Sequence, residues 1–326
     1  MKILVTGARG WLGQAICRVA QEAGHEVISL GRSQGGSGPW QHYIACDLTD
    51  DAALATAADA TIKEVEVVIH CAGYAHRPIE TAAEVLSCDA VNRQGTRRVV
   101  EICRRANIPR LVYLSSIAFY NWNLGSDFDE TGPVIRSTAY AASKLDGETL
   151  VRESNLDWRV IRMGTVYGYG DKANFFKLAE AISRGSFFQP GSGSARKSVL
   201  PIQLAAELIL EISTMRHVAE PLLNLALPDA PSLAQICRTF SRELNGHKVK
   251  RIPLPVMKVL ARLGDGLRLL RPGFPLTSTN LDKLTTSTTV DVTRMKTVFP
   301  NKEWRDFDWW LRESGEYYRT AIIGGL

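Results

Sequence analysis

The stretch KILVTGARGWLGQAICRVAQEAG, residues 2–24, decides the fold. Its apolar start, residues 2–7, predicts a buried strand, and residues 11–24 predict an amphipathic helix. Between strand and helix stand three glycines at a spacing of three: Gly7, Gly10 and Gly13. Glycines at these points permit a tight turn and a close backbone approach, and the helix N-terminus then faces a pyrophosphate. In this setting, after a strand and before a helix, the motif predicts a dinucleotide site.

The pattern repeats outward from this start. Apolar runs alternate with helical patterns, which predicts a parallel sheet buried between two helix layers. We therefore expect a doubly wound α/β fold, with a smaller C-terminal α/β region that binds substrate. Strands are expected at 25–31, 42–48, 65–73, 110–116, 158–168, 222–227 and 248–254. Helices are expected at 89–107, 138–154, 173–185 and 202–213, in two further segments after 229, and in a C-terminal segment with an aromatic face, with a polar loop at 189–198.

The domain boundaries follow from where this rhythm loosens. Residues 1–170 are expected to form the dinucleotide-binding domain, with 200–228 returning to it. Residues 171–199 and 229–326 are expected to form the substrate-binding region. Within it, residues 255–271 make a basic amphipathic segment. Packing against the body is the favoured expectation for this segment, and a position on a membrane surface is the alternative.

Composition and charge disfavour several classes of protein. The net charge of +5 is spread out, and no nucleic-acid-binding motif accompanies it. The six cysteines form no C-x-x-C pair and no metal-ligand spacing with histidine, so we expect reduced thiols, no metal and a cytoplasmic protein. The chain starts directly with a strand rather than a signal peptide, and no apolar run approaches the roughly 20 residues of a transmembrane helix.

The end of the second strand indicates which dinucleotide binds. An NAD site usually places a carboxylate there, to hold the ribose 2′-hydroxyl. Here Gly31 takes that place, Arg32 follows it, and Arg9 lies in the glycine loop. Two guanidiniums suit a 2′-phosphate, so NADP(H) is favoured over NAD(H). Asp47 and Leu48, at the end of the third strand, are expected to meet the adenine.

The segment AYAASKLDGE, residues 139–148, carries the candidate chemistry. Tyr140 and Lys144 stand four residues apart and therefore share one face of a helix. A nearby ammonium favours the phenolate and lowers the pKa of a tyrosine, which can then exchange a proton with an alcohol or ketone.

Together these motifs resemble the extended short-chain dehydrogenase/reductase family, in its branch that acts on nucleotide sugars. The glycine loop, HCAG at 70–73, Asn92, LSS at 114–116 and the pair Tyr140/Lys144 occur in that family's order. The resemblance implies that Tyr140 is the proton donor or acceptor. It implies that Lys144 lowers the pKa of Tyr140 and binds the nicotinamide ribose, and that Ser116 hydrogen-bonds the substrate oxygen. It also implies further cofactor contacts at Trp11, Leu12, Ala72, Gly73, Asn92 and Met163.

The resemblance also bears on the substrate. Ile117 and Ala118 replace the Asp-Glu pair of the family's sugar dehydratases, so elimination of water is disfavoured. Residues 170–198 look like enzymes that reduce UDP-4-keto-6-deoxy-N-acetylhexosamine for bacterial surface polysaccharides, and like UDP-glucose 4-epimerases. The implied substrate-binding residues are Arg77, Ser116, Ala118, Asn174, Arg196 and Lys197.

Four hypotheses on activity stay open. The leading one is an NADPH-dependent 4-ketoreductase of a nucleotide-activated deoxy sugar. A 4-epimerase would keep NAD(H) bound through its cycle, and a reductase of a non-sugar ketone or aldehyde is the third. An NADP-sensing protein without turnover is disfavoured, because Ser116, Tyr140 and Lys144 are all present. The resemblance further implies a homodimer, formed by the helices at 89–107 and 138–154.

Overall fold

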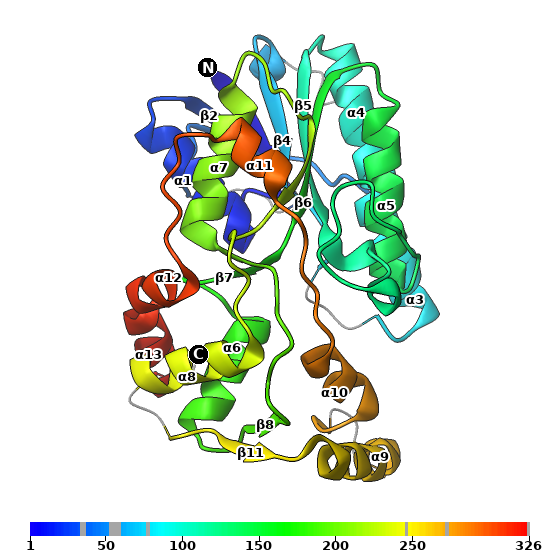
Figure 1. The fold of residues 1–326 in the computed structure, drawn as a ribbon. Helices are drawn as coiled ribbons and strands as arrows, with labels where there is room; N and C mark the ends of the chain where they lie inside the picture. Colours follow the sequence, from blue (N-terminus) through cyan, green and yellow to red (C-terminus); the bar gives the residue numbers. More distant parts are fainter. Residues whose placement is uncertain (33–36, 52–59, 76–78, 245–246, 271–273, 325–326) are drawn as a thin grey trace.

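A seven-stranded parallel sheet forms the centre of the computed structural model (Figure 1). The structure describes residues 1–326 except 33–36, 52–59, 76–78, 245–246, 271–273 and 325–326. The strand order is β10-β6-β5-β4-β1-β2-β3, and every pairing is parallel. These strands are β1 (Lys2–Thr6), β2 (Glu26–Gly31), β3 (His42–Ala45), β4 (Val67–His70), β5 (Arg110–Ser116), β6 (Asp157–Met163) and β10 (Leu222–Leu225). The order reverses between β1 and β4, and doubly wound folds bind their ligands outside the carboxyl ends of the strands at such a point.

Helices cover both faces of this sheet, which confirms the doubly wound fold. Alternate residues of β1 point to opposite faces, so Ile3 and Val5 join one buried cluster and Leu4 joins another. Figure 1 shows α1 and α7 on one face and α4 and α5 on the other. The elements that flank the sheet are α1 (Trp11–Glu22), α3 (Ala82–Asp89), α4 (Gly95–Arg105), α5 (Ala139–Arg152), α7 (Ile202–Thr214) and α11 (Thr293–Val298), with short turns η1 (Ala60–Ile62), η2 (Ala90–Gln94), η3 (Ile117–Phe119) and η4 (Trp122–Leu124).

The remaining elements form the lower part of Figure 1. They are β7 (Thr165–Tyr167), α6 (Asn174–Ser183), β8 (Phe188–Pro190), β9 (Val199–Pro201), α8 (Leu233–Glu243), β11 (Lys250–Ile252), α9 (Leu254–Leu270), α10 (Ser278–Thr285), α12 (Phe307–Glu313) and α13 (Gly315–Ile323). Strand β11 pairs with β8, and β7 pairs with β9, each in a small parallel sheet of its own. Helix α11 contacts β10, so part of the segment after residue 229 also lies against the central sheet.

Several predicted elements have different bounds in the structure. The expected strand at 158–168 divides at Gly164 into β6 and β7. A Cβ on Gly164 would lie 2.8 Å from the Ser198 carbonyl oxygen, so the close approach of residue 198 requires a glycine at this break. The expected C-terminal helix likewise divides into α12 and α13, at Ser314. The expected polar loop at 189–198 begins within strand β8.

The expected helix at 89–107 begins with the π-helical turn η2 before α4. Asn92 lies in this turn, and the turn changes which way the residues around it point. Periodicity counted at 3.6 residues per turn cannot predict such a turn, because the extra residue shifts the helix face.

No helix among the described residues is both long enough and apolar enough to cross a membrane.

Candidate active site

The glycine loop lies at the carboxyl end of β1, against the chain that follows β4. Gly7 has φ +69°, a conformation that favours glycine, and a Cβ there would meet the Ala72 backbone at 2.7 Å. Gly10 begins α1, and no side chain caps this helix among the described residues. A Cβ on Gly13 would lie 2.3 Å from the Gly7 carbonyl oxygen. The loop therefore presents backbone N–H groups at an uncapped helix start, and these residues fit a dinucleotide pyrophosphate.

Trp11 and Leu12 follow in the first turn of α1, and both are half-buried. The Trp11 indole N–H donates to the Tyr169 carbonyl oxygen at 2.6 Å. This bond joins the glycine loop to the chain beyond β7, so Trp11 connects the upper and lower parts of Figure 1.

A buried hydroxyl lies at the end of β2, where the adenosine ribose of a dinucleotide is expected. The Tyr43 hydroxyl has no hydrogen-bond partner among the described residues. It would lie 3.0 Å from a Cβ on Gly31, so this phenol takes up space that a longer side chain at residue 31 would need. Arg9 and Arg32 are exposed. Cationic groups and an unsatisfied hydroxyl at this end fit a 2′-phosphate.

Asp47 and Leu48 hold the chain after β3 in place. The Asp47 carboxylate accepts from the Thr49 N–H at 2.9 Å and from the Thr49 hydroxyl at 2.8 Å. Leu48 is buried, and its carbonyl accepts from Arg98. Both residues are therefore anchored, and their contact with adenine stays a prediction.

Asn92 ties the cofactor loop after β4 to the helix that carries Tyr140. Its Oδ1 accepts from the Tyr74 N–H at 2.7 Å, and its Nδ2 donates to the Ser143 hydroxyl at 2.9 Å. A Cβ on Gly73 would lie 3.3 Å from the same Oδ1. The Ala72 N–H donates to the Thr6 hydroxyl at 3.2 Å. Both the oxygen and the nitrogen of the Asn92 amide are therefore hydrogen-bonded, and they hold the loop after β4 in place.

The structure brings the three candidate catalytic residues together. Ser116 lies at the carboxyl end of β5, and Tyr140 and Lys144 lie in the first half of α5. Tyr140 is half-buried, and its phenol lies near enough to the Ser116 hydroxyl for the hydroxyl to stabilise the phenolate. Ser116 also accepts from the Ala118 N–H at 3.1 Å, which orients its side chain. Met163 lies opposite Ser116 in the register of β5 and β6. Two neighbouring hydroxyls can hold a carbonyl oxygen between them.

The electrostatics of Tyr140 differ from the expectation made from the sequence. Burial raises the pKa of Tyr140, and the hydrogen bond from Ser116 lowers it only in part. Lys144 is buried too, and burial lowers its pKa to about 8. Its ammonium donates to the Leu114 carbonyl oxygen at 2.5 Å and lies 4.2 Å from the Tyr113 ring centroid. In this structure the ammonium is thus bound to the backbone of β5, and the phenol is kept protonated.

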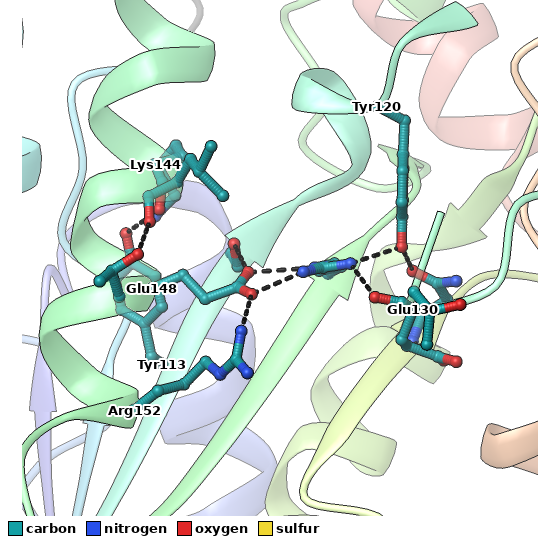
Figure 2. A network of polar contacts seen from close by, with 12 residues as sticks. Tyr113, Tyr120, Glu130, Lys144, Glu148 and Arg152 are labelled. Atoms are coloured by element: carbon teal, nitrogen blue, oxygen red, sulfur yellow. Dashed lines mark hydrogen bonds and ion pairs between the residues drawn. The ribbon is translucent and has the colours of Figure 1, made fainter. Parts of the chain in front are cut away.

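A buried ionic network lies against α5, the helix that carries Tyr140 and Lys144 (Figure 2). Glu148 follows Lys144 by one helical turn, and its carboxylate forms two hydrogen bonds with the Arg162 guanidinium, at 2.7 and 3.1 Å. Arg162 also donates to the Tyr120 hydroxyl at 2.7 Å and to the Glu130 carbonyl at 2.8 Å. Ser115, the neighbour of Ser116, donates to Glu148 at 3.0 Å. The network joins α5, β5 and β6 to the loop after β5.

The far end of the network reaches the C-terminal part. The Tyr120 hydroxyl donates to Asn224 on β10, and the Glu130 carboxylate accepts from the Asn224 N–H at 2.6 Å. Arg294 on α11 forms an ion pair with Glu130 at 3.1 Å. Trp122 stacks on Phe128 in the same loop, which favours loop packing as its role.

The candidate substrate residues beyond β7 are less closely grouped. Asn174 is exposed at the start of α6. The Lys197 ammonium donates to the carbonyls of Lys283 and Thr286 at the end of α10, and burial lowers its pKa to about 8. Arg196 donates to the Ala230 carbonyl at 2.8 Å. Arg77 lies outside the described residues. A role of these residues in holding a diphosphate stays a prediction.

The chain belongs to the NAD dependent epimerase/dehydratase family, whose profile matches residues 3–217. It is similar to 2-alkyl-3-oxoalkanoate reductase of Stenotrophomonas maltophilia (strain K279a), with 32% identity over 63% of this chain and 63% of that protein. It is also similar to dTDP-4-dehydrorhamnose reductase of Mycobacterium tuberculosis (strain CDC 1551 / Oshkosh), with 29% identity over 56% of each chain. The chain therefore spans less than two thirds of the length of either relative.

Among solved structures, the fold matches that of MoeE5 in complex with UDP-glucose and NAD. The TM-score is 0.75 at 21% identity, and the match covers 99% of this chain and 100% of that one. At this identity the likeness shows the fold alone. These comparisons confirm the family resemblance and the fold class expected from the sequence.

Three residues of the site were missed by sequence reasoning. Arg162 is a charged residue inside the apolar run VIRMG, and Glu148 stands one helical turn beyond Lys144. The sequence therefore contains a feature that could have indicated each of them. A charge inside a buried strand implies a buried partner, and the i+4 position is a natural place to look for it. Tyr43 left no signal, because an aromatic residue in a strand is ordinary.

Proposed function

We propose that the protein is an NADPH-dependent reductase of a keto group, and that its substrate is a nucleotide-activated sugar. The observation that carries the proposal is the grouping of Ser116 at the end of β5 with Tyr140 on α5, and with Lys144 one turn further along the same helix. A bound nicotinamide dinucleotide would supply the hydride.

The chain's own residues then provide the proton and its path. The raised pKa of Tyr140 keeps the phenol protonated at neutral pH, so it can give its proton to the oxygen of a ketone. Ser116 donates a hydrogen bond to the same oxygen and holds it at the phenol. Lys144, with a pKa of about 8, is close enough to neutrality to return a proton toward the phenolate that is left.

The choice of NADP(H) rests on the end of β2. Gly31 carries no carboxylate for a 2′-hydroxyl, and Arg32 and Arg9 are exposed there. The Tyr43 hydroxyl, buried without a described partner, would complete the group that holds a 2′-phosphate.

Two other activities are supported by particular observations. A 4-epimerase is supported by the family itself, whose description includes epimerases. A reductase of a non-sugar ketone is supported by the 32% identity to 2-alkyl-3-oxoalkanoate reductase, which is higher than the 29% identity to dTDP-4-dehydrorhamnose reductase.

One set of assays separates these activities. Purified protein is mixed with NADPH and, in parallel, with UDP-4-keto-6-deoxy-N-acetylglucosamine or a 2-alkyl-3-oxo fatty acid, and absorbance of the reduced nicotinamide is followed. The variant Tyr140→Phe runs beside the wild type, with Tyr169→Phe as an exposed control. We expect oxidation of NADPH with the nucleotide sugar, and its loss only in Tyr140→Phe.

The other outcomes redirect the proposal. Oxidation with the keto acid alone would establish the non-sugar reductase. Interconversion of UDP-hexoses with no net oxidation of NADPH would establish the epimerase. A Tyr140→Phe variant as active as the wild type would refute the role of the phenol in any of these reactions.

A further inference from the structure

Helix α9 leaves one long apolar face exposed. Its other face packs on the body through Met257 and Ala261, in a small cluster with Leu281 of α10. This is the packing expected for residues 255–271, and it uses only part of the helix. The exposed side chains on the remaining face are Val256 (49%), Val259 (57%), Leu260 (38%), Leu263 (63%) and Leu267 (47%).

These five residues form a single stripe. Their spacing of three, one, three and four residues brings them to one side of an α-helix. Large apolar residues exposed singly on a surface need no explanation, whereas a continuous stripe of this kind marks an interaction surface.

Cations occupy other positions of the same helix and continue along the strand before it. Residues 248–268 contain six exposed cations and one exposed carboxylate, Asp265. The cations are Lys248, Lys250, Arg251, Lys258, Arg262 and Arg268, and of these Arg268 forms an ion pair with Glu80 at 2.8 Å. Figure 1 shows β11 running into α9 along the end of the molecule that lies away from the N-terminus, so these cations occupy one end of it.

We propose that β11 and α9 form a docking face for an anionic lipid bilayer, on which the protein rests without crossing it. A helix with an apolar stripe and Lys/Arg beside it lies in the plane of a membrane interface, with the stripe among the lipid chains. Each cation held near an anionic surface strengthens binding by about fivefold.

The charge decides against a second copy of the chain as the occupant. A symmetric dimer through this face would bring the same patch against itself, and the six cations of one copy would oppose the six of the other. An anionic bilayer complements these cations instead. The helices expected to form a dimer, α4 and α5, lie on another side of the molecule (Figure 1).

Vesicle flotation tests the proposal on the full chain and needs no knowledge of the substrate. Vesicles of phosphatidylcholine alone are compared with vesicles that contain phosphatidylglycerol, at low and at physiological ionic strength. The apolar variant is Leu263→Gln with Leu267→Gln, and its control is Leu124→Gln with Ile323→Gln, two residues elsewhere that are more exposed. The charge variant is Lys258→Gln with Arg262→Gln, and its control is Arg18→Gln with Lys177→Gln, on α1 and α6.

We expect the wild type to float with the anionic vesicles and not with phosphatidylcholine alone. The apolar variant should bind at least tenfold more weakly, the charge variant about 25-fold more weakly at low salt, and both controls as the wild type does. Unchanged melting temperatures would show that the variants are folded.

Three results would overturn the proposal: no binding of the wild type at low ionic strength, equal binding by the apolar variant, or equal loss in the controls. Concentration-dependent self-association of the wild type, abolished by the apolar variant and without vesicle binding, would assign the face to a second copy instead. None of these results depends on the reductase activity, so the two proposals fail separately.

Discussion

The carboxylate of Glu148 and the guanidinium of Arg162 face each other in a buried bidentate ion pair, directly beneath the helix turn that carries Lys144. Their side chains are 1% and 4% exposed. Both oxygens and two nitrogens are engaged, so neither charge is left without a partner.

Removal of one member of this pair should destabilise the fold strongly. Glu148→Gln leaves the Arg162 charge buried and uncompensated, at an expected loss of about 3–5 kcal/mol in the free energy of unfolding. The double variant Glu148→Leu with Arg162→Met should lose less than either single change. Urea unfolding of Glu148→Gln, of Arg162→Met and of the double variant measures these losses. Glu101→Gln, which breaks the exposed pair with Arg105, should change stability by less than about 0.5 kcal/mol. A small effect of Glu148→Gln would contradict the pairing.

His70 should make the fold sensitive to acid. It is fully buried between the hydroxyls of Thr6 and Thr96, and burial, with a smaller effect of the Lys144 charge, lowers its pKa from 6.5 to about 3. The neutral ring is therefore favoured by folding, and this stability is present above pH 6.5 and is lost as the pH falls toward 3. The slope from this one group is about 1.4 kcal/mol per pH unit.

The variant His70→Gln isolates this contribution. Carboxylates whose pKa is lowered in the folded state also make the unfolding free energy fall with falling pH, but they are identical in both proteins. Unfolding free energies measured from pH 7 to pH 4 should therefore fall less steeply in His70→Gln than in the wild type. Parallel slopes would show that His70 is not held neutral.

Tyr43→Phe should weaken the binding of NADPH and leave the fold intact. The hydroxyl that it removes has no described partner, so the unfolding free energy without cofactor should stay within about 1 kcal/mol or rise. The Kd for NADPH should increase about 10-fold to 150-fold, as expected for the loss of one hydrogen bond to a charged group. Calorimetric titration with NADH gives the matched comparison. An equal loss of affinity for NADH would place the hydroxyl away from the 2′-phosphate.

Asn92→Ala should weaken both the fold and the cofactor site. It leaves the Tyr74 N–H without its partner and removes one of the hydrogen bonds of the Ser143 hydroxyl, at a cost of about 2 kcal/mol. The chain at 72–74 is then no longer held against α5, so the Kd for NADPH should rise as well. Ser143→Ala removes one of these contacts and should have the smaller effect on both measurements. Equal effects of the two variants would indicate that the contact with Tyr74 contributes nothing.

The parts of the fold that follow local rules were predicted from the sequence. The glycine loop, the first strand and helix, and the helix with Tyr140 all lie where periodicity and turn chemistry placed them. The break at Gly164 was missed because its cause is a neighbour 34 residues away, the carbonyl of Ser198. The turn that holds Asn92 was missed because a single added residue leaves no compositional mark.

The candidate site also has parts that the sequence could predict and parts that it could not. Tyr140 and Lys144 could be paired because residues four apart share one face of a helix, and the resemblance to the family assigned their roles and that of Ser116. The pKa direction of Tyr140 could not be found, because it depends on how much protein surrounds the phenol. The contacts of Lys197 with the end of α10 depend on a helix more than 80 residues later, and no local pattern reports them.

The narrow strip where the chain crosses between its two parts has a mechanical consequence. There β7 pairs with β9, the Ser198 N–H donates to the Thr288 carbonyl at 3.0 Å, and the Leu227 N–H donates to the Val199 carbonyl at 2.8 Å. Crossing segments bonded side by side resist sliding and twisting, and bend most easily across their common line. The strip should therefore hold the two parts in register, so that a relative motion of the two parts is a bend across this line rather than a slide along it.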